Sequence, residues 1–230
     1  MITIQLAGVN VGIQNQYDLT TKLREWITDA PPEFTVQVSQ EEIEREGRGE
    51  EMSGQYREFV CVYRHIAERM PDYDAFVFHG AAVAMEGRCF LFTAPSGTGK
   101  TTHVRNWVLR FPRKAYILNG DKPILRRTDR GFRVYGTPWR GKENQGYALD
   151  LPIQGICLLH RGTENRIQSV EGEELVRFLL RQVYLPKDPG RLARLLELLD
   201  ACCREVPAYT MTCTPDPISA QIAWEAMQPK

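Results

Sequence analysis

The sequence lacks the long hydrophobic run and the excess of charge that would assign it to several broad protein classes. No stretch approaches the ~20 apolar residues that span a bilayer, and the N-terminus Met1–Leu6 has no basic flank before its apolar residues. Acidic and basic residues balance at 29 each, so no overall field recruits nucleic acid or an anionic membrane. We therefore expect a cytoplasmic protein with no nucleic-acid or membrane partner.

The six cysteines lack the Cys-x-x-Cys spacing of metal and redox motifs. Three of them, Cys61, Cys89 and Cys157, lie within apolar runs, which predicts buried thiols. The chain also lacks internal repeats and low-complexity tracts. Its 230 residues, 43% of them hydrophobic, are enough to bury a substantial core.

The apolar patterns divide the chain into two predicted regions, residues 1–70 and 71–230. The first is predicted to be a small α+β region packed on the core. Its expected elements are strands at Ile2–Gln14 and Phe34–Val38 and helices at Asp18–Asp29 and Glu58–Met70. The densely charged segment Glu41–Glu51, with Gly47-Arg48-Gly49 at its centre, predicts an exposed loop or a frayed helix end.

The second region is predicted to form a mixed sheet followed by C-terminal helices. Its strands are expected at Ala75–Phe78, Ala81–Ala84, Cys89–Phe92, Ala115–Leu118, Pro123–Arg127, Phe132–Tyr135, Ile153–His160 and Ala208–Thr212. Its last helices are expected at Glu173–Gln182, Arg191–Glu205 and Ala220–Met227. The fold class predicted from these patterns is α/β with an α+β leader.

A glycine-rich segment, Ala94–Thr101, follows an apolar strand pattern and precedes a helical pattern at Thr102–Arg110. From Gly99 onward its spacing matches the Walker A phosphate-binding loop, with Ala94 in place of the first glycine. Gly97 and Gly99 permit the positive φ angles that turn backbone N–H groups onto phosphate oxygens. The alternative, a plain glycine-rich turn, is disfavoured by the flanking strand and helix patterns.

The loop predicts a site for ATP and Mg²⁺. Lys100 is expected to contact the β- and γ-phosphates. Thr101 offers a hydroxyl to Mg²⁺ at the start of a helix, whose N-terminus also favours anions. The residues expected to bind the nucleotide are Ser96, Gly97, Thr98, Gly99, Lys100, Thr101 and Thr102.

Two polar residues that follow apolar strands are candidates to complete this site. Asp121 is predicted as the second metal ligand, because it follows Ala115–Leu118, where an adjacent parallel strand would present its carboxyl end to the phosphates. The alternative is an aspartate that serves only the turn Asn119–Pro123. His79 ends an apolar run just before a glycine, and it either orients a carboxylate or carries a proton, or is a core histidine.

A second group of charges lies at Arg140, Lys142 and Glu143. Arg140 or Lys142 is a candidate to offset charge on the transferring oxygens, and Glu143 to accept the proton of the acceptor. An ordinary surface turn between strands would have the same composition.

Four segments together resemble the HPr kinase/phosphorylase-like proteins, relatives of phosphoenolpyruvate carboxykinase in the nucleotide-binding core. They are His79–Val83, Ala94–Thr101, Ile117–Asp121 and Tyr135–Lys142, and the resemblance covers residues 75 to about 165. It implies a P-loop core in which the γ-phosphate of ATP passes to a serine hydroxyl. Lys100 would then lie on the phosphates, Thr101 and Asp121 on the metal, and His79 beside the acid.

One departure from that family concerns the base. HPr kinases carry two adjacent aspartates, the first serving as base, whereas this chain has Gly120 before Asp121. Three possibilities stay open. Asp121 serves both as metal ligand and as base, or Glu143 or His79 activates the acceptor. In the third, transfer is slow or absent and the protein only binds nucleotide.

The sequence therefore predicts an ATP- and Mg²⁺-dependent kinase whose acceptor is a hydroxyl, on a peptide serine or on a small molecule such as free serine. A catalytically weak nucleotide-binding regulatory module and a P-loop NTPase are the alternatives. The donor, whether ATP, GTP or ADP, stays open. The oligomeric state also stays open, with a homo-oligomer possible. HPr kinases are hexamers, but nothing in this sequence alone indicates that assembly.

Overall fold

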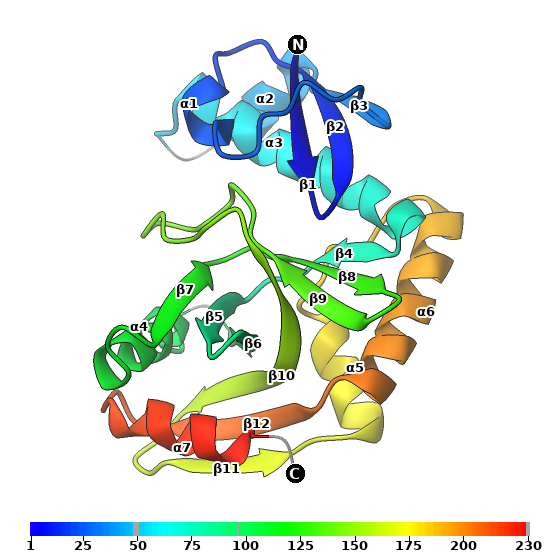
Figure 1. The fold of residues 1–230 in the computed structure, drawn as a ribbon. Coiled ribbons are helices and arrows are strands. Elements are labelled where there is room, and N and C mark those ends of the chain that lie inside the picture. Colours follow the sequence, from blue (N-terminus) through cyan, green and yellow to red (C-terminus); the bar gives the residue numbers. More distant parts are fainter. Residues whose placement is uncertain (48–50, 96, 229–230) are drawn as a thin grey trace.

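The computed structural model describes residues 1–47, 51–95 and 97–228. Within these residues the chain forms a three-stranded sheet near the N-terminus and a nine-stranded sheet that occupies most of the rest. Strands and helices alternate in a mixed α/β arrangement, as predicted (Figure 1). No helix in this part of the chain combines the length and the apolar character needed to cross a membrane.

The N-terminal sheet has the order β1–β2–β3. β1 (Ile2–Leu6) and β2 (Val9–Gln14) form an antiparallel hairpin, and β3 (Phe34–Gln37) runs parallel to β2. The hairpin divides the predicted strand Ile2–Gln14 at the turn Ala7–Gly8, where both residues have positive φ. The helices of this part are α1 (Thr20–Leu23), α2 (Gln40–Glu46) and α3 (Gly54–Arg69).

Two predictions for this region need correction. The expected helix at Asp18–Asp29 is reduced to α1, one turn long. The expected loop or frayed helix end at Glu41–Glu51 begins as a capped helix, α2, because the Ser39 hydroxyl accepts from the Glu42 backbone N–H while the Glu42 carboxylate accepts from Ser39 N–H. The predicted loop centre at residues 48–50 lies outside the described residues.

The large sheet follows the order β4–β8–β9–β10–β6–β5–β7, with β12 on β10 and β11 on β12. A short 3₁₀ helix, η1 (Met70–Tyr73), leads into it from α3. Its strands are β4 (Ala75–Val77), β5 (Ala81–Met85), β6 (Arg88–Thr93), β7 (Ala115–Asn119), β8 (Ile124–Thr128), β9 (Gly131–Tyr135), β10 (Asp150–Arg161), β11 (Arg166–Ser169) and β12 (Ala208–Cys213). β11, short and largely exposed, is not among the predicted strands.

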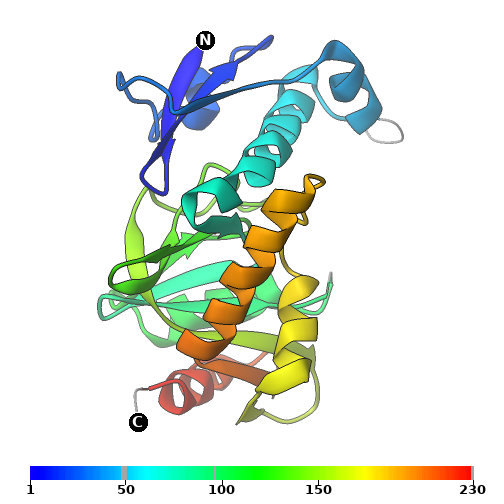
Figure 2. The ribbon, with the colours of Figure 1, turned by 90° about the vertical axis from the view of Figure 1, so that its right-hand side faces the viewer.

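Helices cover both faces of this sheet (Figures 1 and 2). α4 (Lys100–Arg110) and α7 (Ile218–Ala226) bury Trp107 and Ala220 against Phe92 of β6. α5 (Gly172–Leu180) and α6 (Pro189–Glu205) bury Phe178 and Leu195 against Leu91 of the same strand. β6, which delivers the glycine-rich loop, is therefore held by a core on each side.

The strand order differs from the prediction in one respect that concerns the site. β6 and β7 are not adjacent, because β5 lies between them and pairs antiparallel with each. They still run in the same direction, as does β10, which is parallel to β6. The carboxyl ends of β6, β7 and β10 and the start of β5 therefore meet at one edge of the sheet.

The segment 136–147 between β9 and β10 extends toward the N-terminal elements (Figure 1). Trp139 is buried there, stacks on Phe59 of α3 at 5.3 Å between ring centroids, and donates from Nε1 to Phe59 O at 2.9 Å. Trp26 Nε1 donates to Gly136 O at 3.1 Å. The N-terminal elements and the large sheet thus share one hydrophobic core, and the predicted boundary at residue 70 stays a prediction.

Candidate functional site

The glycine-rich loop lies between β6 and α4, as predicted. Gly97 and Gly99 have φ angles of 78° and 113°, which are left-handed values. A Cβ at either position would meet no atom within 4 Å, so glycine is required there for its backbone conformation and not for space. Ser96, one of the predicted nucleotide ligands, lies outside the described residues.

The described part of the loop fits a polyphosphate. No described side chain caps the first turn of α4, so its backbone N–H groups are available to an anion. Thr101 and Thr102 are exposed at this turn, and Thr98 N–H closes the preceding turn on Pro95 O at 3.2 Å. Lys100 is the basic residue at the helix start, with 15% of its side chain exposed.

Asp121 lies at the carboxyl end of β7 in the midst of three basic side chains. Its Oδ1 is 3.3 Å from Lys100 Nζ and 3.4 Å from His79 Nε2, and its Oδ2 is 2.9 Å from Lys122 Nζ. The structure therefore brings together Lys100, Asp121 and His79, which are far apart in the sequence.

The charge balance of this cluster keeps Asp121 ionised. Burial alone would raise the pKa of its carboxyl group, but His79 and the charges of Lys122 and Lys100 outweigh burial and hold the pKa well below its usual range. Burial lowers the pKa of Lys100, and the Asp121 carboxylate opposes that effect. One carboxylate contacts two lysines and a histidine, so the cluster can accept the negative charge of a ligand.

A buried asparagine sets the position of Asp121. Asn119 Oδ1 accepts from the backbone N–H groups of Asp121 and Lys122 at 3.0 and 2.9 Å, and its Nδ2 donates to Thr137 O at 3.0 Å. The turn chemistry that was the alternative explanation for Asp121 is thus present. It aims the carboxylate at Lys100, so the two interpretations are compatible.

His79 is held by groups from two other parts of the chain. Its backbone N–H donates to Gln182 O at 2.6 Å, and the buried Thr93 hydroxyl lies 2.8 Å from His79 O and 2.7 Å from Gln182 Oε1. The Gly80 N–H donates to Asp121 O at 3.0 Å. His79 is half-buried at the start of β5 and is not a core histidine.

Two charged residues of the 136–147 segment form ion pairs that were not predicted from the sequence. Arg140 is paired with Glu25 at 2.6 Å, and its guanidinium lies 4.7 Å from the Trp26 ring centroid. Glu143 is exposed and paired with Arg105 of α4 at 2.5 Å. Arg140 thus joins the N-terminal elements to the large sheet, so the segment is more than a surface turn. The structure does not test the catalytic roles predicted for Arg140, Lys142 and Glu143.

The glycine before Asp121 is closely covered. A Cβ on Gly120 would collide with the carbonyl oxygen of Arg140, and the Gly120 N–H donates to Gln145 O at 3.1 Å. The 136–147 segment therefore occupies the space that a side chain at position 120 would need. The backbone arrangement here therefore fits glycine at position 120 and leaves no space for an aspartate side chain.

A cavity of about 1010 Å³, which we call the Asp121 cavity, lies between α1, α3 and the 136–147 segment. Asp121 lines it together with Tyr63 of α3. Burial, and after it the Asp121 charge, raises the pKa of Tyr63 to about 12, so its phenol stays protonated at neutral pH. The basic residues that line the cavity are Lys22, Arg24, Arg64, Lys122, Arg140 and Lys142, and the acidic ones are Glu25 and Asp121.

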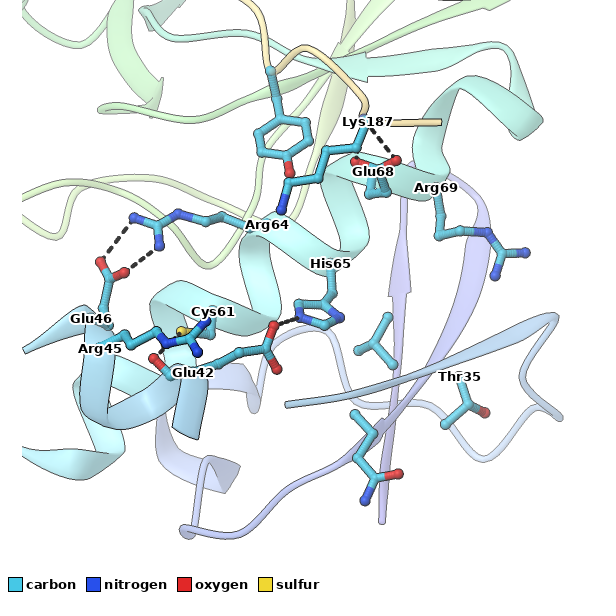
Figure 3. Close-up of a pocket in the computed structure, with 13 residues that line it drawn as sticks. Thr35, Glu42, Arg45, Glu46, Cys61, Arg64, His65, Glu68, Arg69 and Lys187 are labelled. Carbon is cyan, nitrogen blue, oxygen red and sulfur yellow. Dashed lines mark hydrogen bonds and ion pairs between the residues drawn. The ribbon is translucent and has the colours of Figure 1, made fainter. Parts of the chain in front are cut away.

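A second cavity, of about 630 Å³, lies on the other side of α3 between α2, β3 and Tyr184, and we call it the α2–α3 cavity (Figure 3). Most of its charged side chains are in ion pairs, within the cavity or with residues beside it, and only the Lys187 ammonium forms none with a described residue. Arg64 NH2 bonds Glu46 at 2.9 Å, and His65 Nε2 lies 2.9 Å from Glu42 Oε1. Glu68 accepts from the Lys187 backbone N–H at 3.0 Å.

The described residues include no group of three or more His, Cys, Asp or Glu side chains that could hold a metal ion by themselves. Mg²⁺ commonly binds proteins through one or two side chains, with phosphate oxygens and waters completing its shell. Asp121 and Thr101 fit that role, because both lie at the sheet edge where the loop begins α4.

Some residues of this edge were not anticipated from the sequence. Arg161, at the end of β10, donates from NH2 to Gly97 O at 3.0 Å and so places a cation beside the loop. Gln182 and Thr93 fix His79, and Lys122 binds Asp121. The parallel pairing of β10 with β6 places Arg161 beside the loop, and no local sequence motif predicts that pairing.

Comparison with known proteins adds little to this geometry. No family model matches the chain, and no curated protein matches its sequence. Among solved structures it is similar to the HPr(Ser) kinase/phosphatase of Coxiella burnetii, with 10% identity and a TM-score of 0.30, over 53% of this chain and 86% of that one. A likeness at this TM-score carries no information about activity.

Proposed function

We propose that the protein is an ATP- and Mg²⁺-dependent phosphotransferase that passes the γ-phosphate to a hydroxyl group. The observation that carries the proposal is the contact of Lys100, from a Walker A-type loop, with Asp121 at one sheet edge, at 3.3 Å. A loop of this kind positions phosphates, and phosphoryl transfer needs positioning and charge compensation more than covalent chemistry.

Each of these residues has its own role in the proposed transfer. The backbone of Gly97–Thr102 and the Lys100 ammonium bind the phosphates, with the Arg161 guanidinium beside the loop. Thr101 and Asp121 would hold Mg²⁺, which would offset the negative charge of the phosphates. His79 orients the Asp121 carboxylate from 3.4 Å.

In the transfer, the acceptor oxygen forms a bond to the γ-phosphorus while the bond from that phosphorus to the β-bridging oxygen breaks, and ADP leaves. The hydroxyl proton passes to a nearby oxygen or to water. We assign Asp121 to the metal and to acceptor orientation. Glu143 is tied to Arg105 and is not among the residues that line the Asp121 cavity, so we do not assign it the base.

Incubation with labelled ATP and Mg²⁺, with and without hydroxyl acceptors, tests the proposal. Acceptor-dependent ADP formation with transfer of label supports it. Acceptor-independent ADP formation would make the protein an NTPase, and nucleotide binding without any turnover would make it a binding module.

Two carboxylate variants sharpen the same assay. Asp121→Asn is expected to lower Mg²⁺-dependent turnover at least 100-fold, because it removes the only carboxylate among the assigned ligands. Glu143→Gln, a matched change on the neighbouring segment, is expected to keep turnover within twofold. Unchanged turnover in Asp121→Asn would remove the metal role from this residue.

A further inference from the structure

The Asp121 cavity carries positive charge that the described residues do not neutralise. Three of its six basic side chains are paired with carboxylates, two of them with partners that line the cavity. The other three form no ion pair with any described residue: Lys22, Arg24 and Lys142.

These three side chains approach the cavity from two separate segments. Lys22 and Arg24 come from α1 and the residue that ends it, and Lys142 comes from the 136–147 segment. Lys22 Nζ lies 5.5 and 5.3 Å from the ring centroids of Tyr56 and Phe59 on α3. An aromatic wall therefore holds the ammonium in the cavity, where reduced access to water strengthens its attraction for an anion.

Arg140 lines the same cavity, but its guanidinium is already engaged by other residues. Its side chain is 10% exposed, and its Nε is buried without a hydrogen-bond partner among the described residues, although its NH2 is bound by Glu25. Since its Nε is closed to solvent and its NH2 is bound by Glu25, Arg140 is not among the residues that we assign to the anion.

We propose that the Asp121 cavity binds the phosphoryl acceptor and that the acceptor is a small hydroxyl compound with a carboxylate or phosphate group, which Lys22, Arg24 and Lys142 bind. This inference rests on the proposed function, because it names the acceptor class of that transfer. Asp121 and Lys122 line the cavity, and Asp121 Oδ1 also lies 3.3 Å from Lys100 Nζ of the loop, so a hydroxyl held in the cavity can approach the transferring phosphate from the Asp121 side. A volume of about 1010 Å³ is ample for a metabolite-sized ligand.

Matched pairs of acceptors that differ in charge test this inference. N-acetyl-L-serine is compared with N-acetyl-L-serinamide, and glycerol 3-phosphate with glycerol, by ADP formation and label transfer at saturating MgATP. At least one anionic compound is expected to have a kcat/KM tenfold or more above that of its neutral partner. The two pairs distinguish a carboxylate from a phosphate.

A double variant, Lys22→Gln with Arg24→Gln, tests the residues. It is expected to raise the KM for the anionic acceptor at least tenfold while the KM for ATP changes less than twofold. The control is Lys114→Gln with Arg130→Gln, which removes the same charge from exposed positions outside the cavity and is expected to leave both constants unchanged.

The outcomes separate this inference from the proposed function. Equal use of charged and neutral partners would overturn the inference and leave the transferase. If no compound accepts phosphate, the four are titrated calorimetrically onto the protein with MgADP. Binding of an anionic compound that the double variant loses would support the inference while the transfer itself fails. If none of the four compounds binds, the inference is overturned. It is also overturned if an acidic peptide that contains serine accepts phosphate while neither small anionic compound does.

Discussion

The two cavities that border α3 contain similar kinds of side chain, but their charges are matched differently. In the α2–α3 cavity, Arg64 is paired with Glu46 and His65 with Glu42 (Figure 3), and Lys187 is the one basic side chain without a carboxylate partner among the described residues. In the Asp121 cavity, three basic side chains have no carboxylate partner among the described residues. Matched charges stabilise the packing of α2 on α3, whereas unmatched charges at a sheet edge next to a phosphate-binding loop indicate a site for anions.

The comparison also shows what a cavity alone does not reveal. Both cavities are open and polar, and their size does not decide which one is functional. What distinguishes the Asp121 cavity is its position beside the carboxyl end of β7, where Asp121 lines it and also contacts Lys100 of the loop at 3.3 Å. Ligands of α/β proteins collect at such edges.

The largest effect is expected from the loop lysine. Lys100→Ala should weaken ATP and ADP binding by about 3 kcal/mol, roughly 100-fold or more, because it removes a largely buried cation opposite charged oxygens. Equilibrium dialysis with labelled ADP measures this loss, with Lys114→Gln as a control of unchanged affinity. Equal affinity in Lys100→Ala and the unaltered protein would remove the loop from the site.

A smaller effect is expected from placing an acid directly before Asp121. Gly120→Asp should lower the free energy of unfolding by about 2 kcal/mol, because the new Cβ meets the Arg140 carbonyl and the 136–147 segment has to move. That is roughly 4–8 °C in the unfolding temperature measured by calorimetry. Gln145→Asp, an exposed change on the same segment, is the control. A more active and equally stable Gly120→Asp would contradict the packing described here.

The smallest effect is expected in the α2–α3 cavity. Glu42→Gln should leave turnover unchanged and lower stability by no more than about 1 kcal/mol, since glutamine keeps the α2 cap and only a partly exposed ion pair is lost. A hydrogen bond from the Ser39 backbone lowers the pKa of Glu42. Its contribution is therefore present above the unfolded-state pKa and is lost as pH falls through the lowered one.

Thermal unfolding of Glu42→Gln and the unaltered protein at several pH values checks this. The two unfolding temperatures should differ near neutral pH and converge in acid. A large loss of turnover in Glu42→Gln would mean that the matched cavity takes part in the reaction, and would break the comparison.

The sequence predicted those parts of this comparison that depend on local pattern. The apolar strand β6, the positive φ of Gly97 and Gly99, and the helix that starts at Lys100 all follow from residues within one short segment. Asp121 could be placed near the loop because strand ends of one direction meet at one edge.

The sequence did not predict which strands and segments far apart in the chain lie together. Nothing in Ala81–Met85 shows that β5 lies between β6 and β7, since an entirely buried strand fits any interior position of a sheet. The same holds for Arg161 beside Gly97 and for Trp139 under α3. The Asp121 cavity depends on the packing of Trp139 on α3, because it is lined by segments more than 100 residues apart.

Calorimetric titration of the folded protein with ATP and with ADP, in the presence of Mg²⁺, tests most directly whether this loop binds a nucleotide. The account predicts saturable binding of one nucleotide per chain and binding roughly 100-fold or more weaker to Lys100→Ala. The absence of any binding to folded, unaltered protein would contradict it.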